Sequence, residues 1–212
     1  MKIKVCGLKY RDNIEVVSAL GPDYMGFIFY GNSPRFVGEI SGDIFGGIPA
    51  SVNKTGVFVD ESIDTVSRLT DKYNLDAIQL HGNESAEFCD HFKGKVKVIK
   101  AFGIDENFSF GGLERYDGVV DFFLFDTKTP VHGGSGKAFD WNLLNDYKLN
   151  IPFFLSGGLS LENLEEIKKI GHEHFYGVDL NSKFETAPGL KDISKLEKAF
   201  NIIKPATHEL RS

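Results

Sequence analysis

Short apolar runs recur along the whole chain, with about 20 to 30 residues from one run to the next. They cover residues 3–6, 25–30, 55–59, 76–80, 96–102, 122–125, 151–155 and 175–180. Most of these runs are apolar at successive positions, which is typical of strands buried on both faces in a parallel sheet. The spacing leaves room for a helix between consecutive strands, as parallel strand–helix–strand units require.

Helical patterns fall between the apolar runs, at residues 12–20, 62–73, 83–92, 140–147, 160–170 and 193–203. Ser62 is a candidate N-cap for the second of these helices. Ser160 and Asn163 form a capping-box pattern in which Asn replaces the usual Glu or Gln, and that helix is expected to end at Gly171. The glycine-rich connections 38–47 and 107–118 are expected to be short or irregular.

Eight strands alternating with helices could form an open doubly wound sheet or a closed barrel, and periodicity does not decide between them. A dinucleotide-binding fold requires G-x-G-x-x-G after the first strand, whereas this chain has Cys6-Gly7-Leu8-Lys9 there. We therefore predict an α/β fold, a single (β/α)8 TIM barrel. The barrel is expected to span residues 1–204 as one catalytic domain, followed by a frayed polar tail over residues 205–212.

Composition narrows the partners and the compartment. A length of 212 residues is near the short end for such a barrel, about 200 to over 400. The net charge of -6 argues against a nucleic-acid partner, which favours a basic face. The two cysteines form no CxxC, and the six histidines show no metal-ligand spacing, so no metal is expected. No signal-peptide or membrane-spanning run is recognisable, so a cytoplasmic location is expected.

Reactive residue types cluster where the predicted strands end. In a barrel the active site lies at the C-terminal ends of the strands. Read in chain order, those ends carry Cys6, Tyr30, Asp60, His81, Phe102, Asp126, Ser156-Gly157-Gly158 and Asp179. Because the strands themselves are apolar, this distribution favours an enzyme.

The first strand has two distinct faces. Alternation places Lys4 and Cys6 on one face, with Ile3 and Val5 on the other. The apolar face should meet the helices, so Lys4 and Cys6 should point into the barrel. An ammonium beside the thiol would lower its pKa and favour the thiolate. The alternative is that Cys6 is a small buried hydrophobe, as most free cysteines are.

Four further features suggest ligand contacts, each with a plainer alternative. Asp126 ends an aromatic strand, where apolar surroundings would favour a protonated acid, although Asp also caps strands. Gly157 and Gly158, like Asn181 and Ser182, follow the last two strands, where such barrels bind phosphate. Arg35 has the planar fork that matches a carboxylate, or makes a surface ion pair. The glycine-rich segment 131–136 is either a ligand-contacting lid or a plain flexible loop.

The chain also resembles the phosphoribosylanthranilate isomerase family, (β/α)8-barrel enzymes of tryptophan biosynthesis, from Lys4 to about Phe200. The segments that carry the resemblance are Lys4–Leu8, Gly26–Tyr30, Ser33–Arg35, Gly56–Val59, Gln79–Gly82, Asp126–Thr127, Gly133–Gly136, Phe139–Trp141, Ser156–Leu159, Gly177–Asp179 and Pro188–Gly189. Each segment is modest alone, but the set in this order and spacing is specific.

The resemblance implies a role for each matching residue. Cys6 is expected to be the general base and Asp126 the general acid, while Arg35 meets the anthranilate carboxylate. The expected substrate-binding residues are Lys4, Arg35, His81 and Asp179, and the expected phosphate-binding residues are Gly157, Gly158, Asn181 and Ser182. The family commonly has Ser-Ser-Gly after the last strand, where this chain has Asn181-Ser182-Lys183. Whether Lys183 contacts the phosphate is left open.

The implied reaction is an Amadori rearrangement of a small phosphosugar, which needs one acid, one base and no cofactor. A monomer or homodimer is expected. One rival is the related barrel isomerase that acts on the histidine-pathway aminoaldose, but its family has an aspartate where Cys6 stands. A second rival is a non-catalytic phosphosugar-binding barrel. The third rival is a structural or interaction protein, but such a role would not explain the polar residues at the strand ends.

Overall fold

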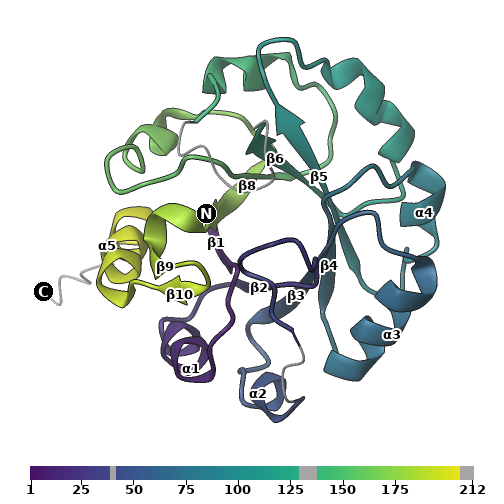
Figure 1. Ribbon diagram of the computed structural model, residues 1–212. Coiled ribbons are helices and arrows are strands. Elements are labelled where there is room, and N and C mark those ends of the chain that lie inside the picture. The colour runs from purple at the N-terminus through teal and green to yellow at the C-terminus, as the bar shows by residue number, and fades with distance from the viewer. Residues whose placement is uncertain (39–41, 129–137, 206–212) are drawn as a thin grey trace, which may run out of the picture.

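The computed structural model describes residues 1–38, 42–128 and 138–205, and in these residues eight parallel strands close into a barrel (Figure 1). Each strand pairs with the next along the chain, and β1 pairs with β8 to close the ring. The strands are β1 Lys2–Cys6, β2 Tyr24–Ile28, β3 Asn53–Phe58, β4 Ala77–Leu80, β5 Lys97–Ile104, β6 Phe122–Thr127, β7 Phe153–Leu155 and β8 Phe175–Leu180. The predicted (β/α)8 fold is confirmed.

Helices surround the ring of strands (Figure 1). The α-helices are α1 Arg11–Ala19, α2 Gly42–Gly46, α3 Ile63–Tyr73, α4 Ala86–Asp90 and α5 Ile193–Ile203. The 3₁₀ segments are η1 Phe110–Tyr116, η2 Trp141–Asp146, η3 Glu166–Lys169 and η4 Ser182–Phe184. A short antiparallel hairpin, β9 Glu185–Ala187 with β10 Leu190–Lys191, follows the last barrel strand. The sequence did not predict this hairpin.

Helix starts agree with the sequence better than helix lengths do. Ser62 caps α3, since its hydroxyl accepts a hydrogen bond from the amide of Thr65. The predicted helices over 140–147 and 160–170 are instead 3₁₀ segments and turns. At Ser160 half of the capping box forms, because the Ser160 amide donates to Asn163 Oδ1 at 2.9 Å. The Asn163 amide group donates back to Gly158, which ties this segment to the loop before it.

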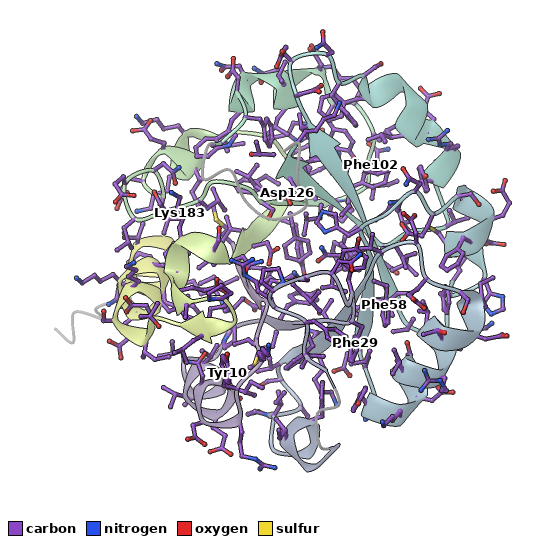
Figure 2. The ribbon with its side chains drawn as sticks, in the orientation of Figure 1. Tyr10, Phe29, Phe58, Phe102, Asp126 and Lys183 are labelled. Atoms are coloured by element: carbon purple, nitrogen blue, oxygen red, sulfur yellow. The ribbon has the colours of Figure 1, made fainter. Side chains whose placement is uncertain are left out.

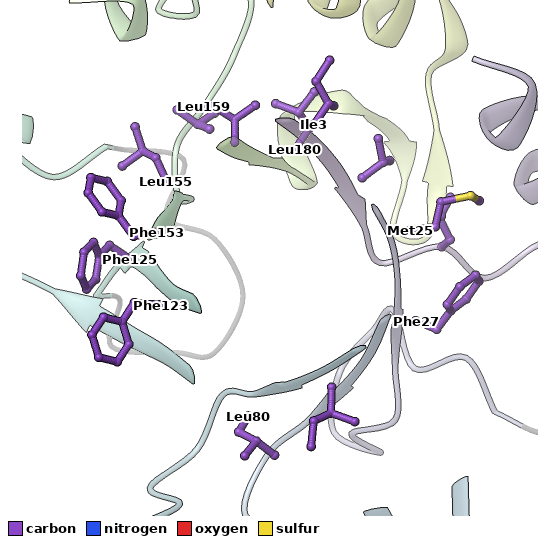
Figure 3. Packing of buried hydrophobic residues seen from close by; sticks show 14 of the residues in the cluster. Ile3, Met25, Phe27, Leu80, Phe123, Phe125, Phe153, Leu155, Leu159 and Leu180 are labelled. Carbon is purple, nitrogen blue, oxygen red and sulfur yellow. The ribbon is translucent and has the colours of Figure 1, made fainter. Parts of the chain in front are cut away.

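The main core lies between the strands and the surrounding helices. Figure 3 shows labelled side chains such as Met25, Phe125 and Phe153 on the outer side of the strands. Ile3 and Val5 belong to the same core and are fully buried, as alternation along β1 predicted. The helices therefore cover an apolar outer surface of the barrel, and the opposite residues of each strand are left to fill its interior.

A second, smaller core fills the N-terminal end of the barrel interior, and we call it the floor cluster. It consists of Tyr24, Ala77, Ile99, Ala101, Leu124 and Phe154, with Phe122 and Tyr176 packed against it. The rings of Tyr24 and Phe154 meet edge to face, with their centroids 5.2 Å apart. Because the floor cluster fills this end, open space in the barrel lies toward the C-terminal ends of the strands.

Two expectations fall outside the described residues: the glycine-rich segment 131–136 and, apart from Pro205, the tail 205–212. Within the described ranges, no helix is both long enough and apolar enough to cross a membrane.

Candidate active site

A cavity of about 490 Å³ opens at the C-terminal ends of the barrel strands. Its volume is within the usual range for a small-molecule site. The predicted site residues that line it are Cys6, Arg35, His81, Asp126, Gly157, Gly158, Asp179, Asn181 and Ser182. The structure thus brings nine of the ten predicted site residues together around one cavity. Lys4 is the predicted site residue that does not line it.

Lys4 lies behind the cavity wall. Its side chain is fully buried, and its ammonium donates to Asp179 Oδ1 at 2.8 Å. The Ser156 hydroxyl donates to the other oxygen of Asp179, at 3.4 Å. The expected substrate contact of Lys4 is therefore not supported, since its ammonium is used to hold Asp179. Asp179 itself reaches the cavity.

Cys6 reaches the cavity from the end of β1. A Cβ atom at Gly26, its neighbour on β2, would lie 2.6 Å from Cys6 Sγ, so only glycine leaves room for the thiol there. The expectation of a lowered thiol pKa is wrong. Burial raises the pKa of Cys6, and the charge of Asp179 adds to this, while the ammonium groups of Lys4 and Lys191 oppose it without reversing it.

Asp126 lies at the end of β6, near the centre of the barrel in Figure 2. Its Oδ2 atom is 3.5 Å from Nε2 of His81, which follows β4. The other ring nitrogen of His81, Nδ1, is 2.8 Å from the side-chain nitrogen of Gln79. Both Asp126 and His81 keep more than a quarter of their side-chain surface exposed, so both are accessible from the cavity.

The loop after β7 approaches Asp126 closely. Gly157 has φ +81°, and a Cβ atom there would lie 2.4 Å from the amide nitrogen of Thr127 and 2.5 Å from Asp126 Oδ1. Gly158 also has positive φ, at +67°. Glycine is therefore required at position 157 both for backbone conformation and for space. This bare backbone beside a predicted acid is the kind of surface on which a ligand can sit against N–H groups.

Arg35 reaches the cavity but is held by a partner that the sequence did not indicate. Its Nε and Nη2 atoms donate to Glu185 of β9, with Nη2 at 2.7 Å from Oε2. Glu185 also accepts from the fully buried ammonium of Lys191 at 2.7 Å. Lys191 in turn donates to Asn181 Oδ1 at 2.9 Å. The β9–β10 hairpin thus anchors Arg35 through the Glu185 carboxylate and the loop after β8 through the Lys191 ammonium.

The charges of Arg35, Glu185 and Lys191 shift the pKa values of the two buried groups. Burial alone would raise the pKa of Glu185, but Arg35 and Lys191 together hold it below its usual range. Burial lowers the pKa of Lys191, and Glu185 opposes that shift. Lys183 is exposed and does not line the cavity. Within the described part of the chain, no three His, Cys, Asp or Glu side chains gather closely enough to hold a metal ion.

The fold and this cavity define a (β/α)8-barrel protein in which a thiol, an imidazole and carboxyl side chains line one cavity at the C-terminal ends of the strands. A family model described as N-(5'phosphoribosyl)anthranilate (PRA) isomerase matches residues 3–202. The chain belongs to this family.

Individual relatives agree over nearly the full length. The N-(5'-phosphoribosyl)anthranilate isomerase of Parabacteroides distasonis is 44% identical, covering 100% of this chain and 98% of the relative. The one from Phocaeicola vulgatus is 41% identical, over 96% of this chain and 98% of the relative. The crystal structure of phosphoribosyl anthranilate isomerase from Thermus thermophilus has a TM-score of 0.82 at 29% identity, covering 96% of this chain and 98% of that one.

Proposed function

We propose that this protein converts N-(5-phosphoribosyl)anthranilate to 1-(2-carboxyphenylamino)-1-deoxyribulose 5-phosphate, an isomerase step of tryptophan biosynthesis, in one catalytic domain of residues 1–204. The observation that carries the proposal is the single cavity that Cys6 and Asp126 share, although they come from strands that are not neighbours in the barrel. A solved relative, with a TM-score of 0.75 and 29% identity, is described in complex with reduced 1-(o-carboxyphenylamino)-1-deoxyribulose 5-phosphate.

In the proposed mechanism Asp126 acts first. It gives its proton to the furanose ring oxygen as the bond from that oxygen to C1 breaks, and the anthranilate nitrogen forms a Schiff base to C1. The Cys6 thiolate then takes the proton from C2, and the C2–H electrons form the enolamine. Tautomerisation gives the ketose product. Protons move and the redox change stays within the sugar, so the reaction needs no cofactor or metal as co-reactant.

The raised pKa of Cys6 shapes how the base would work. Burial disfavours the thiolate and raises the pKa of the Cys6 thiol. The ammonium groups of Lys4 and Lys191 are the cations that favour the thiolate. The base therefore depends on these buried lysines, although neither is placed to touch the reacting carbons in this proposal.

Substrate orientation is assigned to the rest of the cavity wall. The Arg35 guanidinium would meet the anthranilate carboxylate with the edge that Glu185 leaves, since Nη1 takes no part in that pair. Asp179 and His81 would contact the sugar. Gly157, Gly158, Asn181 and Ser182 would hold the phosphate with backbone and side-chain donors. Holding the substrate at both ends is worth a large factor in rate, because it aligns C2 with the base.

The partner is proposed to be this phosphosugar alone, with no nucleic acid, and the chain is proposed to be a monomer or homodimer. A phosphoribosylanthranilate isomerase from Thermotoga maritima is described as dimeric, and sedimentation of this chain would test its own state. A cytoplasmic location is supported by the two free cysteines, Cys6 and Cys89, which suit a reducing compartment.

Product fluorescence with freshly made phosphoribosylanthranilate tests the proposal. Wild type should turn over, and Cys6→Ala and Asp126→Asn should each lose on the order of 10²- to 10⁴-fold in rate. Cys89→Ala and Asp146→Asn are matched controls outside the cavity and should keep wild-type rates. Near-full turnover in both active-site variants would refute the acid–base assignment. A folded wild type without turnover would favour the binding-barrel alternative.

A further inference from the structure

Gln79 is a buried polar side chain that the proposed mechanism does not use. It lies on β4 with only 1% of its surface exposed and lines the cavity wall. Along this strand Ala77 belongs to the floor cluster, whereas Ile78 and Leu80 face the outer core. Alternation therefore turns Gln79 inward, above the floor cluster. A buried amide needs hydrogen bonds, so its partners indicate what it does.

The partner of Gln79 is the imidazole of His81. Gln79 Nε2 lies 2.8 Å from His81 Nδ1, and an amide nitrogen can only donate. His81 Nδ1 must then be the acceptor and carry no proton. The ring proton of a neutral imidazole consequently sits on Nε2, the nitrogen that faces Asp126 Oδ2 at 3.5 Å.

The orientation of the Gln79 amide follows from its surroundings. Among the described residues, Gln79 Oε1 is buried and has no hydrogen-bond partner. Turning the amide over would give His81 Nδ1 an acceptor, but it would place the NH2 group where Oε1 now lies, with nothing to accept its hydrogens. A buried N–H group without a partner is rarer than a buried carbonyl without one. The observed orientation is therefore favoured.

We propose that Gln79 is a positioning residue that fixes His81 as the neutral Nε2–H tautomer, so that His81 presents a hydrogen-bond donor to Asp126. This inference rests on the proposed function, in which Asp126 is the general acid. An imidazolium in this place would hold Asp126 ionised and leave it no proton to give. A neutral N–H donor stabilises the Asp126 carboxylate that forms as the proton leaves. Before that step it favours the ionised form of Asp126 much less than an imidazolium would.

The two carboxylate oxygens of Asp126 lie in different surroundings. Oδ2 faces His81 Nε2, whereas Oδ1 lies against the Gly157 backbone in the loop after β7. Gln79 lies on β4, and His81 directly follows that strand. The row of side chains Gln79, His81 and Asp126 therefore runs from β4 to β6 within the cavity. Because Gln79 acts through His81, its loss should change catalysis more than substrate binding.

Nitrogen NMR of the histidine side chains tests the tautomer directly in the full-length protein without substrate. The His81 signals are assigned by their absence in His81→Asn. Wild type is expected to show an unprotonated Nδ1 and a protonated Nε2. A proton on Nδ1 in wild type would overturn the proposal, and this result needs no folded Gln79 variant.

Two substitutions at Gln79 then separate positioning from structure. Gln79→Met keeps the length but cannot donate, so His81 should sample both tautomers and kcat should fall about 10-fold, while KM changes much less. Gln79→Glu offers an acceptor, so it should place a proton on Nδ1 and lower kcat further. Thr55→Val, a buried polar position on β3 outside the cavity lining, is the control and should leave both the tautomer and kcat unchanged.

The outcomes are distinguishable from failure of the proposed function. Wild type without turnover would contradict the isomerase assignment, whereas the NMR signals decide the tautomer whether or not the protein turns over substrate. An unchanged tautomer and unchanged kcat in Gln79→Met would overturn the positioning role. Loss of kcat in Gln79→Glu together with a protonated Nδ1 would support it.

Discussion

The two ends of the barrel interior use the same strands in opposite ways. At the N-terminal end, the floor cluster is built from aromatic and aliphatic side chains, with Tyr24, Phe122, Phe154 and Tyr176 in mutual ring contact. At the C-terminal end, Asp126 is the next inward position after Leu124 on β6, and Cys6 lines the cavity from the end of β1. Strands such as β4 and β6 thus supply packing at one end and cavity-lining polar side chains at the other. The separation lets the site carry desolvated charges on a scaffold whose stability comes from elsewhere.

The strongest test of this division is to damage the floor cluster. Phe154→Ala removes a fully buried ring from the centre of the cluster and should destabilise the fold by about 3–5 kcal/mol. Urea unfolding measures the loss, and kcat per folded molecule should stay close to wild type. Phe154→Leu, which keeps most of the volume, is the matched control and should lose less. A large fall in kcat for the folded variant would show that the two ends are coupled.

A substitution at the mouth should blur the comparison. Lys4→Met leaves the Asp179 carboxylate buried without its cation, and we expect a loss of about 3 kcal/mol. This is the lower end of the usual range, since the Ser156 hydroxyl still donates to Asp179. The double variant Lys4→Met with Asp179→Leu should regain most of the stability but not the activity. A single variant as stable as wild type would contradict this reading of the pair.

The pH dependence of this pair has a definite sign. Burial lowers the pKa of Lys4, but Asp179 and Cys6 together raise it above its ordinary range. A group with a raised pKa in the folded state contributes stability that is fully present below its unfolded value. The contribution of Lys4 should therefore be lost only at alkaline pH, as the pH rises through the raised value, and the difference between wild type and Lys4→Met should shrink there.

A smaller effect is expected from the hairpin that borders the mouth. Glu185→Gln keeps the shape of the side chain but removes the charge that orients Arg35. KM for phosphoribosylanthranilate should rise about 10-fold, equivalent to about 1.4 kcal/mol, with little change in kcat. Glu197→Gln, an exposed position on α5, is the control. A fall in kcat with unchanged KM would show that Glu185 acts on the chemistry rather than on carboxylate binding.

The sequence predicted the floor and the mouth unequally. Alternation over residues 2–6 was enough to turn Lys4 and Cys6 inward, because the side-chain period of a strand is fixed. Strand ends located His81, Asp126 and Asp179, since parallel strands in a barrel end at the same edge. These are local properties, and they need no knowledge of which strand lies next to which.

What the sequence could not give was pairing across the fold. Arg35 and Glu185 are 150 positions apart, and Glu185 lies in a three-residue strand within a stretch that has no strand pattern. The thiol pKa was predicted in the wrong direction because neighbouring charges are visible in β1 but burial is not. Residues 160–170 were predicted as an α-helix because positions i and i+3 share a face in both helix types.

The last and smallest effect concerns the reactivity of Cys6. Only the thiolate is alkylated, so a thiol whose pKa is raised by burial should react with iodoacetamide more slowly than a free thiol at neutral pH. The difference in alkylation rate between Cys6 and a free thiol should narrow as the pH rises through the raised pKa of Cys6. On the acid side of that pKa, kcat/KM should rise with pH. Cys89→Ala removes the second thiol, whose pKa burial raises to about 11. Faster alkylation than a free thiol at neutral pH would mean that Lys4 and Lys191 outweigh burial in solution. Cys6 would then already be a thiolate before substrate binds.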